Sequence, residues 1–155
     1  MTVRIPQVAD AGLLSAKAQI LAATMYPEFI PDIEKIHWLV RDCTNQPDHH
    51  YSRVIGSPGQ PTAAILTRTE NNLWAMRKHA TLLMWYSDIP GAGATLLRGF
   101  RDWVKTQKQV MAAGFTADWV RKNDRSLLLA GKIGFTKRGE GGYVFFPRGA
   151  KHESR

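Results

Sequence analysis

The sequence predicts an α/β domain built on one mixed sheet that is flanked by helices. Segments of strand and helix character follow one another in the order β-α-α-β-β-β-α-β-α-β. Hydrophobic residues make up 44% of the 155 residues, which suffices for a normal core and argues against disorder. The chain shows no repeat and no linker, so we expect one domain over residues 1–148 and a polar tail over 149–155.

The first half of the chain is expected to supply two helices and four strands. Val3 and Ile5 alternate with polar neighbours and indicate a short opening strand. Asp10 is the expected cap of the first helix, and Pro27 stops it. Turn residues separate the strands that follow. The predicted elements are helices over 11–25 and from 32 onward, and strands over 52–55, 62–67 and 81–86.

The second half begins with a strongly amphipathic helix over about 91–107. Its apolar face is formed by Leu96, Leu97, Phe100, Trp103 and Val104. A short strand over 110–115, a helix over 123–132 and a last strand over 141–146 complete the order.

The net charge of +8 lies entirely in the second half of the chain. Residues 1–97 contain eight Lys and Arg and eight Asp and Glu, whereas residues 98–155 contain thirteen and five. A field of one sign suits a polyanionic ligand, either nucleic acid or a phosphate-rich cofactor. A solvated basic face without a partner remains the alternative.

The sequence favours a cytoplasmic protein. No apolar run approaches the ~20 residues that a membrane span needs, and the N-terminus has no signal-peptide core. Cys43 is the single cysteine, which excludes an internal disulfide and fits a reducing compartment.

The apolar strand over residues 81–86 is followed by a Gly-x-Gly turn that opens the amphipathic helix. The first four amides of a helix lack intrahelical partners and carry partial positive charge, so such a turn can hold phosphate. The turn lacks the third glycine of a dinucleotide fingerprint and the Gly-Lys-Ser/Thr ending of a P-loop. On spacing alone, an ordinary tight connection is the favoured interpretation.

Two motifs in the right order resemble those of the GNAT family, the acyl-CoA-dependent N-acyltransferases. Residues 88–97 read Asp-Ile-Pro-Gly-Ala-Gly-Ala-Thr-Leu-Leu, similar to the family's Gln/Arg-x-x-Gly-x-Gly/Ala turn and paired aliphatics. Residues 123–135 read Asn-Asp-Arg-Ser-Leu-Leu-Leu-Ala-Gly-Lys-Ile-Gly-Phe. They are similar to the family's second motif, in which Asn is followed by small and aliphatic residues and then by Lys-aliphatic-Gly-Phe. The chain departs at Asp88, where Gln or Arg is usual, and at Ala130, where tyrosine is common. The general pattern also resembles acyltransferases encoded by tailed phages.

The resemblance implies that acetyl-CoA, or another acyl-CoA, is the cofactor. Its pyrophosphate is expected on the amides of the glycine turn, with Gly93 facing solvent. Its pantetheine arm is expected where the fourth and fifth strands splay apart, at the small residues 112–114. The implied cofactor-binding residues are Trp85, Tyr86, Gly91, Ala92, Gly93, Ala94, Thr95 and Asn123, and a backbone amide near Trp85 or Tyr86 would polarise the thioester.

Acyl transfer to an amine also requires a base and an acid. His79 is the candidate base because an imidazole titrates near neutral pH. Tyr86 and Tyr143 are the candidate acids in place of the tyrosine missing at Ala130. Each has an alternative reading: a surface histidine for His79 and packing for the tyrosines. A chain of water molecules could also replace a side-chain base.

Other groups of residues give weaker evidence for a functional site. His37, Cys43, His49 and His50 have no standard zinc spacing, so we expect no metal. Residues 119–122, Trp-Val-Arg-Lys, could line an acceptor site.

The predicted function is therefore acetyl transfer from acetyl-CoA to a primary amine, on a small molecule, a protein lysine or an N-terminus. The alternative is a weakly active or inactive protein with the same fold, such as a phage virion or host-interaction protein, because Asp88 and Ala130 both alter the site. Nucleic-acid binding ranks last because no recognised motif supports it.

Overall fold

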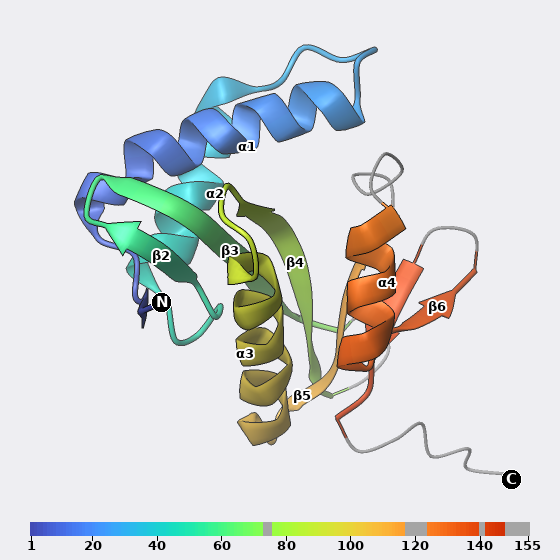
Figure 1. The fold of residues 1–155 in the computed structure, drawn as a ribbon. Helices are drawn as coiled ribbons and strands as arrows, with labels where there is room; N and C mark the ends of the chain where they lie inside the picture. The colour runs from blue at the N-terminus through green and yellow to red at the C-terminus, as the bar shows by residue number, and fades with distance from the viewer. Residues whose placement is uncertain (73–75, 117–123, 140–141, 148–155) are drawn as a thin grey trace, which may run out of the picture.

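A seven-stranded sheet forms the centre of the computed structural model, which describes residues 1–72, 76–116, 124–139 and 142–147 (Figure 1). The strand order is β1-β2-β3-β4-β5-β7-β6, and β4 and β5 run parallel while the other neighbouring pairs are antiparallel. The elements are β1 (Val3–Arg4), a 3-10 helix (Val8–Asp10), α1 (Ala11–Met25), α2 (Ile33–Asn45), β2 (Arg53–Ser57), β3 (Gln60–Asn71), β4 (Lys78–Ser87), α3 (Ala92–Thr106), β5 (Val110–Thr116), α4 (Asp124–Ile133), β6 (Thr136–Arg138) and β7 (Gly142–Phe145).

The mixed α/β architecture confirms the predicted fold class. The sequence missed one strand, β6, which forms a hairpin with β7. Its three residues are polar and all exposed, so the alternating pattern that reveals a half-buried strand is missing there. No helix in the described residues is long and apolar enough to cross a membrane.

Helices cover both faces of the sheet. On one face, Leu14 of α1 and Val40 and Cys43 of α2 pack against Ala64 and Leu66 of β3. On the other face, α3 packs against the alternate residues of the same strand, and α4 packs beside α3 in the same core. Burial of both faces explains why β3 shows a nearly continuous buried run rather than a clean alternation.

Asp10 does not cap α1 through its side chain, contrary to expectation. Its carboxylate is fully buried and accepts hydrogen bonds from Arg4 at 2.7 and 2.9 Å, from the Gln7 amide and from the Gly59 amide. Burial by itself raises the pKa of Asp10, but these donors outweigh burial and leave the pKa below its usual range. Asp10 therefore ties the start of the chain to the β2–β3 turn.

A β-bulge at Leu83 interrupts β4. Leu66 pairs with Met84 and Thr67 pairs with Leu82, so Leu83 is one residue more than the partner strand supplies. Leu82 packs in the core under α3, whereas Met84 packs in the core under α1 and α2. Leu82 and Met84 therefore lie on opposite faces of the sheet, although residues two positions apart in a regular strand share a face.

The parallel strands β4 and β5 separate beyond Thr81. Their register runs from Lys78 opposite Val110 to Thr81 opposite Gly114 and ends there. Residues 82–87 of β4 continue without a β5 partner, as the predicted splay requires. The small residues 112–114 lie in the paired part, so their expected place at the gap is wrong.

Candidate active site

The N-terminus of α3 has no side-chain cap. Gly91 precedes the helix with φ of +80°, a conformation that favours glycine, and its carbonyl accepts both the amide and the hydroxyl of Thr95. The Thr95 amide is thus already bonded within the helix. The amides of Gly91, Ala92, Gly93 and Ala94 are the ones without intrahelical partners. They concentrate partial positive charge at this point.

Glycine occupies the two positions of the turn for different structural reasons. A Cβ at Gly91 would meet nothing within 4 Å, so this exposed residue leaves open space beside the amides. Gly93 is buried, which corrects the expectation that it faces solvent. The Trp85 Nε1–H donates to the Gly93 carbonyl at 3.0 Å, and a Cβ at Gly93 would lie 3.1 Å from that nitrogen. Gly93 therefore makes room for the indole of Trp85.

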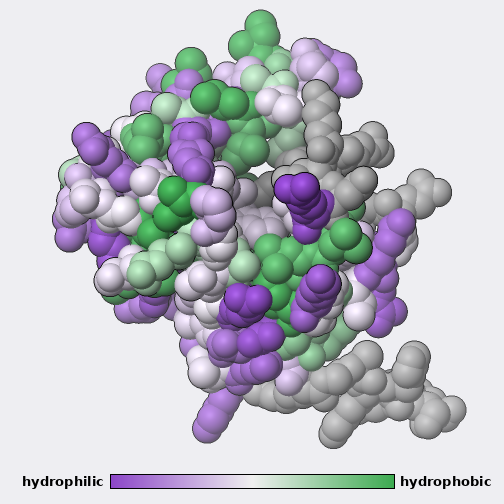
Figure 2. All heavy atoms as spheres, viewed as in Figure 1, coloured by the Kyte–Doolittle hydropathy of each residue, from purple (hydrophilic) through white to green (hydrophobic). Residues whose placement is uncertain are grey.

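The glycine turn lines a cavity of about 570 Å³ together with the start of α4. The surface is hollowed between α3 and α4, and hydrophilic side chains flank the hollow (Figure 2). Arg125, Ser126 and Leu129 of α4 face the turn across this cavity. Arg125 is exposed and adds a full positive charge to a site already lined by helix amides. The sequence did not single it out, because only the packing of α3 beside α4 brings it there.

The open edge of β4 forms the inner wall of this cavity. The Asp88 amide donates to the Thr62 carbonyl at 2.8 Å, beside the antiparallel pair of β3 and β4. Because bonding alternates along such a pair, the amides of Trp85 and Ser87 turn away from β3. They therefore turn toward the side where β5 has separated from β4.

No protein-family model matches this sequence, and no curated protein matches it significantly. Solved structures do match. A ribosomal-protein-alanine N-acetyltransferase from Brucella melitensis aligns with a TM-score of 0.64 at 17% identity, over 94% of this chain and 99% of that one. An acetyltransferase of the GNAT family from Streptococcus pneumoniae aligns with a TM-score of 0.59 at 13% identity, over 92% and 95%. The NatC complex bound to Gag peptide and CoA aligns with a TM-score of 0.65 at 11% identity, over 94% and 97%.

The chain has the GNAT acetyltransferase fold. Its two departures from the family motifs can now be located within that fold. Ala130 is fully buried in the core under α3 and α4. Asp88 lies at the rim of the cavity, where its carboxylate accepts two hydrogen bonds of 3.1 Å from Lys17 of α1. Asn123 and residues 119–122 lie outside the described residues.

The two candidate tyrosines occupy different surroundings in the GNAT fold. The Tyr86 hydroxyl donates to the Pro61 carbonyl at 3.0 Å, and burial raises the pKa of Tyr86 to about 12. Tyr143 stacks on Phe115 at 5.3 Å between ring centroids, where β5 pairs with β7. Phe115 follows Gly114, the last residue of β5 that pairs with β4, so Tyr143 lies across β5 from the point where the two strands separate.

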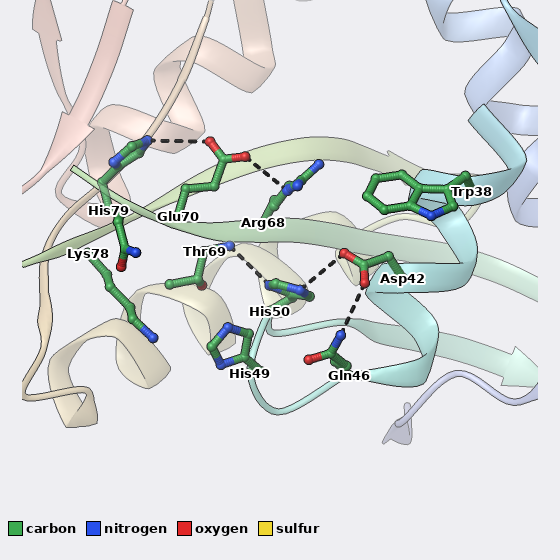
Figure 3. A pocket seen from close by; sticks show the side chains of 11 residues that line it. Trp38, Asp42, Gln46, His49, His50, Arg68, Thr69, Glu70, Lys78 and His79 are labelled. Carbon is green, nitrogen blue, oxygen red and sulfur yellow. Dashed lines mark hydrogen bonds and ion pairs between the residues drawn. The ribbon is translucent and has the colours of Figure 1, made fainter. Parts of the chain in front are cut away.

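His79 lies at the other end of β4 from the glycine turn. Tyr86 is seven positions further along the strand, which is ~23 Å at ~3.3 Å per residue. It lines a separate cavity of about 720 Å³ and lies 3.9 Å from Glu70 (Figure 3). The structure therefore does not bring His79 together with the residues of the glycine turn.

The same distant cavity contains the buried His50. Its Nδ1 accepts the Thr69 amide at 3.1 Å, so the neutral ring carries its proton on Nε2, 3.3 Å from the Asp42 carboxylate. Burial is the main cause that lowers the pKa of His50, and the neighbouring His49 adds to it. Within the described residues, no three His, Cys, Asp or Glu side chains gather as a metal site requires.

Proposed function

We propose that this protein is an acyl-CoA-dependent N-acyltransferase that moves an acetyl group from acetyl-CoA to a primary amine by direct attack. One observation carries the proposal. The N-terminus of α3, which has no side-chain cap, lines a cavity of about 570 Å³ with Gly91, Gly93 and Ala94, beside the unpaired edge of β4. A helix end without a side-chain cap satisfies its donors with water or with a ligand. An anion is the ligand that such an end favours.

The residues of the cavity fit a phosphate-bearing cofactor. The amides of Gly91, Ala92, Gly93 and Ala94 would hold the pyrophosphate, and Arg125 would add a charge-assisted contact. The open edge of β4 would accept the pantetheine arm, with the Trp85 amide as a donor to the carbonyl oxygen that becomes more negative during transfer. When bound, acetyl-CoA supplies an activated thioester.

Tyr143 is the proposed proton donor to the departing thiolate. Among the described residues, no hydrogen-bond partner occupies its hydroxyl, whereas that of Tyr86 is held by the Pro61 carbonyl. The stack on Phe115 fixes the ring on β7, one strand beyond the point where β4 and β5 part. We assign no base to His79 because of its distance along β4. Water in the open cavity would take the proton of the attacking ammonium.

The acceptor is a primary amine, carried by a small molecule, a protein lysine or a peptide N-terminus. The NatC complex noted above is bound to both a peptide and CoA, which supports testing peptides as acceptors.

A second candidate function has its own observation. Ala130, where the family commonly carries tyrosine, is fully buried, and the hydroxyl of Tyr86 is engaged elsewhere. A protein with the GNAT fold that binds CoA but transfers nothing would show these same features. The two functions differ in turnover and agree in cofactor binding.

Calorimetric titration with acetyl-CoA tests the shared cofactor site, and thiol release in the presence of lysine peptides, N-terminal peptides and polyamines tests turnover. Release with one acceptor supports the enzyme. We then expect Tyr143→Phe to lower the rate about 100-fold while leaving the affinity for CoA unchanged. Binding without release from any acceptor supports the second candidate. No binding at millimolar acetyl-CoA overturns both.

A further inference from the structure

An ion pair joins α1 to the rim of the proposed cofactor cavity. Lys17 Nζ lies 3.1 Å from both carboxylate oxygens of Asp88 and 4.9 Å from the centre of the Tyr86 ring. Asp88 is three residues before Gly91, and its side chain is 54% exposed while that of Lys17 is 32% exposed. The pair crosses 71 positions of sequence, so only the folded chain forms it.

The negative charge of Asp88 is unfavourable at the rim of a site that binds phosphate. An acidic side chain at the rim of an anion site repels phosphate by about as much as a cation there would attract it. The other charged side chain lining the cavity among the described residues, Arg125, lies across it on α4. Lys17 cancels the charge of Asp88 at its source, because its ammonium bonds both carboxylate oxygens.

We propose that Lys17 is a positioning residue for the cofactor phosphates, which restores neutrality at the rim where Asp88 would otherwise repel them. This inference rests on the proposed cofactor site. It explains how α1 takes part in cofactor binding although it is distant in sequence from both motifs. It also explains how the chain tolerates an acidic residue at the first position of its glycine motif.

A set of four proteins tests the inference through CoA affinity. Lys17→Met leaves Asp88 uncompensated, so we expect affinity to fall about tenfold. Asp88→Asn leaves Lys17 uncompensated, so we expect affinity to rise about tenfold. The double variant has the net charge of the natural rim and should bind CoA within about twofold of the unchanged protein. Raising the salt concentration should bring all four affinities together.

A purely structural role predicts a different order. If the pair mattered because it anchors α1, both single variants and the double variant would bind CoA more weakly than the unchanged protein. That order of affinities would overturn the inference. Thermal unfolding of each variant checks the fold, and an exposed pair of this kind should change stability by no more than ~1 kcal/mol.

Lys105→Met provides the matched control. Lys105 is also paired with an aspartate, Asp102 at 3.5 Å, but it lies near the far end of α3, roughly 20 Å from the glycine turn at ~1.5 Å per residue. Its CoA affinity should not change. Failure of the unchanged protein to bind CoA would refute the proposed function itself, whereas CoA binding that Lys17→Met leaves unaltered would refute only the role of Lys17.

Discussion

A cavity lies at each end of β4, but the polar groups at the two ends differ in how many of them are already hydrogen-bonded within the protein. At the C-terminal end, the first amides of α3 have no side-chain cap and the edge of β4 has no β5 partner. At the N-terminal end, polar side chains bond one another: His50 lies between Thr69 and Asp42, and Arg68 pairs with Glu70 at 2.9 Å (Figure 3). The first end is prepared for a ligand, and the second is largely satisfied from within.

This difference shows why polar composition alone is a poor guide to a site. The cavity at the N-terminal end has more histidines and carboxylates, and a larger volume, than the cavity at the glycine turn. Its two unsatisfied buried side-chain atoms, the Thr69 hydroxyl oxygen and His79 Nδ1, lie on separate strands. The amides of the glycine turn instead belong to one helix end, so their partial charges add at one point.

The largest expected effect is at the glycine turn. Gly91→Asp places a carboxylate at the proposed phosphate site, and we expect CoA affinity to fall by about 100-fold or more. Gly139→Asp is the matched control, because Gly139 also has positive φ, at +62°, and open space around its Cβ position. Aspartate tolerates this backbone conformation better than most residues. Equal CoA affinities of the two variants in calorimetry would mean that the turn is only a connection.

At the N-terminal end of β4, removal of a hydrogen-bond partner should lower the free energy of unfolding and leave the affinity for CoA unchanged. Asp42→Ala leaves the Nε2–H of the buried His50 without its acceptor, so we expect the free energy of unfolding to fall by ~2 kcal/mol. Denaturation in urea measures this change. Asp48→Ala is the control, since Asp48 is 76% exposed in its pair with Arg53 and should contribute under ~1 kcal/mol. A loss of CoA affinity in Asp42→Ala would contradict the separation of the two ends.

A smaller effect should appear as a pH dependence of stability. The pKa of His50 is lowered in the folded protein, so the unfolded chain binds its proton more readily. The contribution of His50 to stability is therefore complete above its unfolded pKa of about 6.5 and decreases as the pH falls from there toward the lower folded value. His50→Asn removes this titration. Urea denaturation between pH 5 and 8 should show a shallower slope for the variant, and identical slopes would refute the prediction.

The smallest expected effect concerns His79. We expect His79→Ala to leave CoA affinity and the rate of thiol release within about twofold of the unchanged protein, because ~23 Å of strand separates this residue from Tyr86. Steady-state kinetics with the best acceptor provides the measurement. A rate loss of about 100-fold, the size expected for a general base, would indicate that His79 is the base.

The sequence could predict what depends on local pattern. Helix α1 has the predicted bounds, and α3 and the glycine turn follow from apolar spacing and backbone rules. It could not predict what depends on packing between distant segments. The contact of Trp85 with Gly93, the position of Arg125 and the pair of Lys17 with Asp88 all require the folded sheet and its helices. The bonds of Asp10 to Arg4 and Gly59 displaced its expected capping role for the same reason.

The bulge at Leu83 gives β4 a place where its length can change. Met84 and Leu82 already lie opposite consecutive residues of β3, so a deletion of Leu83 would leave a regular strand pair and keep Trp85 toward α3, where it bonds the Gly93 carbonyl. An insertion of one residue beyond Met84 would instead exchange the two cores for every later side chain of β4. Natural variants of this chain should therefore lose a residue at Leu83 more readily than they gain one between Met84 and Ser87.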